Sequence, residues 1–117
     1  MDKNVMIVVE GDLFGHVLAR EFASQGFDVC GVMSRGEEAI EHARREQPDT
    51  LLVDLLLDGE LDGIETAHRI QKMHDTKVVF LQHRLSNTHQ KKLKCIDNLT
   101  VLDKQDASPE NIIEAAK

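Results

Sequence analysis

This chain of 117 residues has few aromatic residues, fewer basic than acidic residues and no long apolar run. Each of these features excludes a class of protein. Four Phe with neither Tyr nor Trp leave no stacking platform for bases. The 14 basic residues are outnumbered by 21 acidic ones, and the net charge of −7 argues against nucleic-acid binding by this domain. No apolar run is long enough to span a bilayer, so we expect no membrane association.

Cysteine is equally rare. Cys30 and Cys95 have no CxxC spacing, which predicts two buried, reduced thiols rather than a disulfide or a metal site. The first four residues lead directly into an apolar run and leave no room for a signal peptide, so we expect a cytoplasmic protein. A hydrophobic content of 41% suits one domain with one core, residues 1–117.

Five apolar runs alternate with segments of helical periodicity. The runs are continuous rather than alternating, as expected for strands that are covered on both faces. Short right-handed connections fold such a pattern into an α/β protein, a (βα)5 doubly wound sheet of five parallel strands. The predicted strands are residues 5–9, 29–33, 51–54, 78–81 and 99–102.

The helical segments differ in how clearly the sequence predicts them. Asp12 is predicted to cap the first helix, and Ser108 with Pro109 marks the start of the last one. The fourth is the weakest, because residues 86–92 contain no apolar side chain and only Leu85, Leu93 and Ile96 could anchor it. We expect this helix to be short, mobile or displaced.

Charged residues stand where three of the apolar runs end. Asp54 closes the third run, Glu10 follows the first and Lys104 follows the fifth. In an open parallel sheet, ligands bind beyond the carboxyl ends of the strands, where the strand order reverses. Two carboxylates and an ammonium group brought to that edge predict a site for a cation and a phosphate-like group. Taken singly, each could instead be a cap, a solvated strand end or a surface lysine.

Residues 48–54, followed by residues 57–65, carry an Asp-x-x-Leu-x-Gly-x-x-Asp-Gly-like segment. Together with the order and spacing of Glu10, Asp54 and Lys104, this segment resembles the receiver domain of two-component response regulators over essentially the whole chain. The resemblance implies a flavodoxin-like, CheY-like fold with strand order 2-1-3-4-5.

The resemblance also implies roles for individual residues. Asp54 would be the phosphoacceptor, receiving a phosphoryl group from a sensor histidine kinase or a phosphotransfer protein. Glu10, Asp54 and the backbone carbonyl of Leu56 would hold Mg²⁺, which prefers oxygen ligands and keeps several waters. Lys104 would contact the phosphoryl oxygens, and the face formed by the fourth helix, the fifth strand and the last helix would signal to a downstream effector protein or domain.

Four positions depart from the family pattern. Receivers usually have two adjacent acids after the first strand, but here the first is Val9 and only Glu10 remains. Gln82 occupies the switch position that normally holds Ser or Thr, and Val101 replaces the switch aromatic. Gln105 replaces the proline that usually follows the lysine. Because losing an outer-shell metal partner costs about 10–100-fold in affinity, we expect weak Mg²⁺ binding and an altered switch.

Two other functions remain open. A pseudo-receiver, acting as a protein-interaction or dimerisation module without phosphorylation, would fit Val9, Gln82 and Val101, and the sequence leaves open whether the chain forms a homodimer. A small flavodoxin-like enzyme or nucleotide binder would need a Gly-rich phosphate loop after the first strand, where this chain has carboxylates. We expect the six histidines to lie at the surface, with His83 as a modulator of the site.

Overall fold

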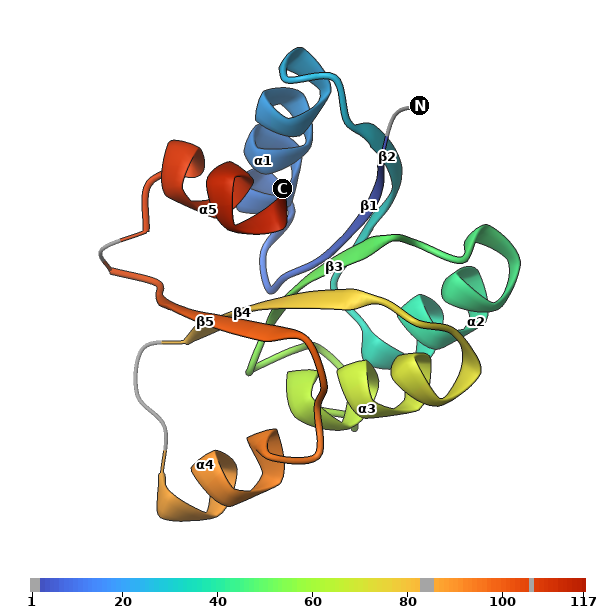
Figure 1. Ribbon diagram of the computed structural model, residues 1–117, viewed down its shortest axis with the longest axis vertical. Coiled ribbons are helices and arrows are strands. Elements are labelled where there is room, and N and C mark those ends of the chain that lie inside the picture. Colours follow the sequence, from blue (N-terminus) through green and yellow to red (C-terminus); the bar gives the residue numbers. More distant parts are fainter. Residues whose placement is uncertain (1–2, 83–85, 106) are drawn as a thin grey trace.

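The computed structural model describes residues 3–82, 86–105 and 107–117. Figure 1 shows a central parallel sheet with helices on both faces. Its strands are β1 (Asn4–Val8), β2 (Asp28–Met33), β3 (Thr50–Asp54), β4 (Lys77–Gln82) and β5 (Leu99–Asp103). The helices are α1 (Asp12–Ser24), α2 (Gly36–Glu46), α3 (Gly63–Met73), α4 (Asn87–Leu93) and α5 (Pro109–Ala116).

The strand order is β2-β1-β3-β4-β5, with all neighbouring strands parallel, as predicted. The chain runs from β1 outward to β2 and then returns to the other side of β1 for β3. The order therefore reverses between β1 and β3, which is where the crevice of such a sheet opens. This reversal brings the end of β3 beside the end of β1.

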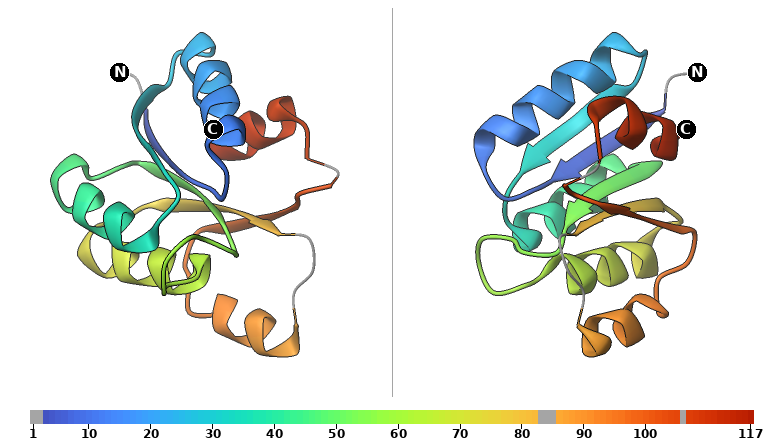
Figure 2. Two further views of the ribbon diagram at one scale, coloured as in Figure 1. Left: turned by 180° about the vertical axis from the view of Figure 1, so that it is seen from behind. Right: turned by 90° about the vertical axis from the view of Figure 1, so that its left-hand side faces the viewer.

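The sheet divides the apolar core in two, and Figure 2 shows the helices that cover its two faces. Alternate residues of each strand point to opposite faces, so Met6 and Val8 pack under α2 and α3, whereas Val5 and Ile7 pack under α1 and α5. The central strands are buried on both faces, which explains why their sequences are continuous apolar runs.

Side-chain caps mark the starts of α3, α4 and α5. Ser108 accepts a hydrogen bond from the Asn111 N–H and Pro109 begins α5, as predicted. The prediction for Asp12 was wrong, because α1 begins at Asp12 and Gly11, with φ of 88°, occupies the N-cap position. A positive φ is easily adopted only by glycine, so Gly11 makes the sharp turn out of β1.

The weak fourth helix is short, as expected. It has seven residues, and of these only Leu93 is buried. Ile96, just beyond it, is also buried, whereas the predicted anchor Leu85 lies outside the described residues. The burial predicted for Cys95 was wrong: its side chain is exposed, because Leu93 and Ile96 take the inward positions of this segment, and Cys30 is only partly buried.

Across the described ranges, no helix combines the length and the apolar content that a membrane crossing requires.

Candidate functional site

A pocket opens at the carboxyl edge of the sheet, where β1, β3, β4 and β5 end. Its volume is about 160 Å³. All three charged residues singled out from the sequence contribute to its wall, although they are separated by 44 and 50 positions along the chain. The lining residues are Glu10, Asp54, Leu55, Leu56, Leu81, Gln82 and Lys104.

Asp54 is the buried acid of this pocket. It is the last residue of β3 and is only 3% exposed. Its Oδ2 accepts a hydrogen bond from the Glu10 backbone N–H at 3.3 Å and one from Lys104 Nζ at 2.8 Å. Burial raises the pKa of the Asp54 carboxyl above its usual value, and the Lys104 ammonium opposes that rise. Both hydrogen bonds end on Oδ2, so Oδ1 is the oxygen left to face an incoming ligand.

Lys104 is held in place by its backbone as well as by its charge. It follows directly after β5, and its N–H donates to the Gln82 carbonyl at 2.8 Å, which continues the β4–β5 pairing by one residue. Its side chain is 26% exposed, and its ammonium lies 5.4 Å from the centre of the Phe14 ring of α1. The cation is thus fixed between a carboxylate and an aromatic face while one side remains open to the pocket.

Glu10 and its neighbour Val9 have opposite environments. Glu10 is exposed at the mouth of the pocket, so its carboxylate is free to reach a solvated cation. Val9 is 1% exposed and packs in the core cluster under α1 and α5. An apolar side chain therefore stands where the receiver pattern has its first acid, and the pocket contains one carboxylate fewer.

The donor set of the pocket suits a hard divalent cation. Glu10 and Asp54 offer carboxylate oxygens, and Leu56, two residues after β3, lines the same pocket from the loop with its side chain turned largely to solvent. Among the described residues, no three His, Cys, Asp or Glu side chains gather into a metal-binding group. A cation held here would therefore rely on two carboxylates, one backbone carbonyl and water, which is a set typical of Mg²⁺.

The two residues of the predicted switch lie differently. Gln82 ends β4 and lines the pocket, and its Oε1 is buried without a hydrogen-bond partner in the part of the chain that the structure describes. Val101 lies in β5, is 39% exposed and is not among the residues that line the pocket. Of the two, only Gln82 is placed to meet a group bound beside Asp54. His83 lies outside the described residues.

Sequence reasoning missed two residues that shape the site. Phe14 supports Lys104, and Gly63, the first residue of α3, touches the backbone of Asp54. A Cβ at position 63 would lie 1.8 Å from the Asp54 carbonyl oxygen. The signal for Gly63 was present, because a glycine at the first position of a helix has no helical advantage and indicates a close approach.

Comparison with known proteins supports one family. The family model of the response regulator receiver domain matches residues 5–117. The chain is 42% identical over 55 residues to the response regulator protein VraR of Staphylococcus saprophyticus, covering 46% of this chain and 26% of that protein. It is 32% identical over 72 residues to the alkaline phosphatase synthesis transcriptional regulatory protein PhoP of Bacillus subtilis, covering 62% of this chain and 29% of that protein. The matches thus span less than a third of these two relatives.

Solved structures agree with the sequence comparison. The signal receiver domain of a modulated diguanylate cyclase from Desulfovibrio desulfuricans has a TM-score of 0.87 and 30% identity, over 98% of this chain and 90% of that one. The signal receiver domain of NarL from Mycobacterium tuberculosis has the same fold, with a TM-score of 0.83 and 22% identity, over 97% and 92%. Since the family model covers nearly the whole chain, this protein belongs to the response regulator receiver domain family, the signalling modules of two-component systems.

Proposed function

We propose that the chain is a phosphoacceptor receiver that takes a phosphoryl group on Asp54. The observation that carries the proposal is the contact between Lys104 Nζ and Asp54 Oδ2, 2.8 Å long, in a pocket that Glu10 also lines. A buried carboxylate with one oxygen free is a competent nucleophile for an in-line phosphoryl transfer. The phosphodonor would be a sensor histidine kinase or a phosphotransfer protein.

The chain's own residues divide the work of this transfer. Asp54 Oδ1 attacks the phosphorus, and the bond from phosphorus to the leaving group of the donor breaks. Lys104 stabilises the negative charge that spreads over the transferred oxygens, because its ammonium already faces this carboxylate. Glu10, Asp54 and the Leu56 carbonyl would hold Mg²⁺, and the bound cation would supply positive charge to offset that of the phosphoryl group. Transfer is thus self-catalysed by a switch module, not by a separate enzyme site.

The absence of a second acid predicts weak metal binding. Val9 cannot accept a hydrogen bond from metal-bound water, and loss of such an outer partner costs about 10–100-fold in affinity. We expect phosphorylation to need higher Mg²⁺ concentrations than in receivers with both acids. The modification would then be read by a downstream effector protein or domain at the α4–β5–α5 face, in the cytoplasm.

The proposal is tested by mass. The protein is incubated with Mg²⁺ and acetyl phosphate and weighed intact, with and without chelation of the metal. The wild type should gain one phosphoryl group, and Asp54→Asn should gain none. Asp58→Asn is the matched control, because it removes an exposed carboxylate from the same segment. An unmodified wild type, or an equal gain in Asp54→Asn, contradicts the assignment.

A second function is favoured by the buried Val9 and by the Gln82 amide in the switch position. A pseudo-receiver would use its surface for constitutive contacts with a partner or with a second copy of the chain. It predicts that beryllofluoride with Mg²⁺ leaves the NMR spectrum unchanged and that partner binding is equal for the wild type and Asp54→Asn. The phosphoacceptor predicts shifts that spread from the pocket.

A further inference from the structure

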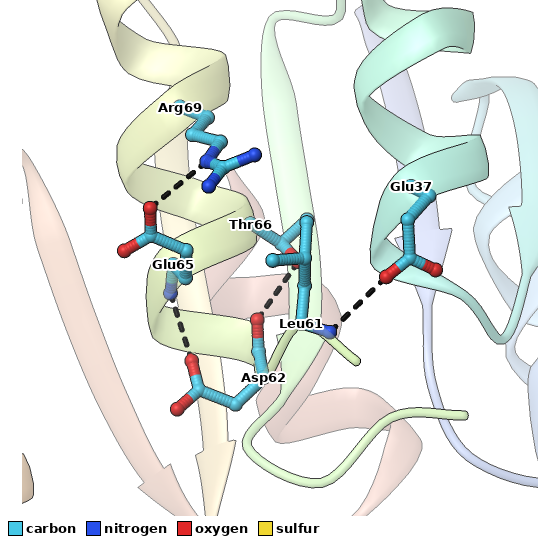
Figure 3. A network of polar contacts seen from close by, with 6 residues as sticks. All are labelled: Glu37, Leu61, Asp62, Glu65, Thr66 and Arg69. Atoms are coloured by element: carbon cyan, nitrogen blue, oxygen red, sulfur yellow. Dashed lines mark hydrogen bonds and ion pairs between the residues drawn. The ribbon is translucent and has the colours of Figure 1, made fainter. Parts of the chain in front are cut away.

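The loop between β3 and α3 is tied to the side of the molecule that carries α2. The Asp58 N–H donates to the Ser34 carbonyl at 2.9 Å, and the Leu61 N–H donates to Oε1 of Glu37 at 3.1 Å. The second bond is drawn in Figure 3, where the Glu37 side chain reaches from the start of α2 to the loop. The loop therefore has two anchors outside its own strand and helix.

The far end of the same loop is fixed to Leu55, the residue that follows β3. The Gly63 N–H donates to the Leu55 carbonyl at 2.8 Å, directly beside Asp54. Asp62 caps α3 through the Glu65 N–H, and its carbonyl accepts from Thr66 Oγ1 at 2.8 Å, as Figure 3 shows. Leu56 lies between these fixed points. Leu56 thus belongs to the loop that these bonds hold, and it lines the pocket.

Glu37 is more enclosed than its place on a helix surface suggests. Its side chain is 40% exposed, yet Oε2 is buried and has no hydrogen-bond partner among the described residues. The nearest cation is Arg35, whose Nη2 lies 3.5 Å from Oε2. Gly59 covers this oxygen with φ of 87°, and a Cβ there would lie 2.5 Å from it. The loop is shaped around the carboxylate.

We propose that Glu37 is a positioning residue of the phosphoacceptor pocket. Its carboxylate holds the Leu61 N–H, and by restraining the loop that contains Leu56 it would keep the Leu56 carbonyl available to a cation beside Asp54. This inference rests on the proposed function. It assigns to α2 a part in the metal affinity of a pocket that it does not touch.

Three substitutions separate the reach of Glu37 from its charge. Glu37→Asp keeps the charge but is one methylene too short for the Leu61 N–H, whereas Glu37→Gln keeps the acceptor and loses the charge. Glu37→Ala removes both. Glu38→Ala is the matched control, because Glu38 is an exposed acid in the same first turn of α2. A role in helix-dipole stabilisation alone would spare Glu37→Asp and penalise Glu37→Gln.

The readouts are the Mg²⁺ concentration at half-saturation, from amide NMR shifts, and hydrogen exchange of the Leu61 amide. We expect Glu37→Ala and Glu37→Asp to raise the half-saturation concentration about tenfold and to speed exchange at Leu61. Glu37→Gln should stay within about threefold of the wild type, and Glu38→Ala should equal it. At saturating Mg²⁺, the yield of phosphorylated protein should be the same in all of them.

Two results overturn the inference in different ways. If the wild type binds Mg²⁺ and Glu37→Asp binds it equally while Leu61 exchanges faster, the loop does not set metal affinity, and the proposed function stands. If the wild type neither responds to Mg²⁺ nor accepts phosphate, the proposed function fails and this inference fails with it. Should Glu37→Ala not fold, the inference is decided by the difference between Glu37→Asp and Glu37→Gln in Mg²⁺ half-saturation concentration and in exchange of the Leu61 amide.

Discussion

Replacing Gly63 by alanine is expected to destabilise the fold and to disturb the acceptor at the same time. The added Cβ would lie 1.8 Å from the Asp54 carbonyl oxygen, whereas an ordinary contact needs at least 3.4 Å. The two atoms must therefore move apart by about 1.6 Å. Because the obstructing atom is backbone, in a strand paired on both sides, no rotation of a side chain relieves the contact.

The size of the effect follows from two opposing contributions. Overpacking against a rigid neighbour costs about 3 kcal/mol, and alanine in place of glycine in a helix returns about 1 kcal/mol at most. The net loss is about 2 kcal/mol. A chain of this length has an unfolding entropy of about 0.25 kcal/mol per degree, so Tm should fall by about 8 °C.

The assay is thermal unfolding followed by far-ultraviolet circular dichroism, together with the rate of phosphorylation by acetyl phosphate. Gly26→Ala is the control, because Gly26 also has a special backbone, with φ of 88°, but no atom within 4 Å of its Cβ position. It should lose only about 1 kcal/mol and keep the wild-type phosphorylation rate. If Gly63→Ala is no less stable than Gly26→Ala, the argument from close contact is refuted.

Three further predictions concern the pocket itself. Asp54→Asn should raise Tm at pH 7, because burial raises the pKa of Asp54 in the folded state and the ionised carboxylate therefore destabilises the fold above that pKa. Below the ordinary pKa of an aspartate the carboxyl is protonated in both the folded and the unfolded state, so this destabilisation disappears. The increase in Tm, measured by thermal melts, should therefore vanish near about pH 4. Val9→Asp should tighten Mg²⁺ binding about tenfold in an NMR titration while lowering metal-free stability by about 2 kcal/mol, since position 9 is buried; unchanged affinity would contradict the account of the missing acid. Gln82→Met should increase the free energy of unfolding by about 1 kcal/mol in urea titrations, because it removes a buried oxygen with no partner in the described part of the chain; a loss of stability would show that this oxygen is satisfied.

Much of the fold was predictable because burial on two faces leaves a simple pattern in sequence. The strands of the sheet centre are continuous apolar runs, and helix starts such as Ser108-Pro109 have local capping chemistry. The weakness of α4 was equally readable from its lack of apolar residues. The exposure of Cys95 was not, because it depends on which neighbours in an irregular segment turn inward.

The site was predictable only as far as strand ends reveal it. Parallel strands deliver their carboxyl ends to one edge, so Glu10, Asp54 and Lys104 could be brought together without coordinates. The bond from Glu37 to the Leu61 N–H joins residues 24 positions apart and depends on loop conformation, which has no periodicity to read. Likewise, nothing in the sequence states that the Gln82 oxygen is enclosed.

The two cysteines give this chain a usable asymmetry for spectroscopy. Burial raises the pKa of the Cys30 thiol to about 11, so at neutral pH it is almost wholly protonated and slow to alkylate, whereas Cys95 lies open to solvent after α4. A maleimide dye should therefore attach at Cys95 without mutagenesis. In a protein without tryptophan or tyrosine, that dye would report on the segment joining α4 to β5 while a ligand binds in the pocket beside Asp54.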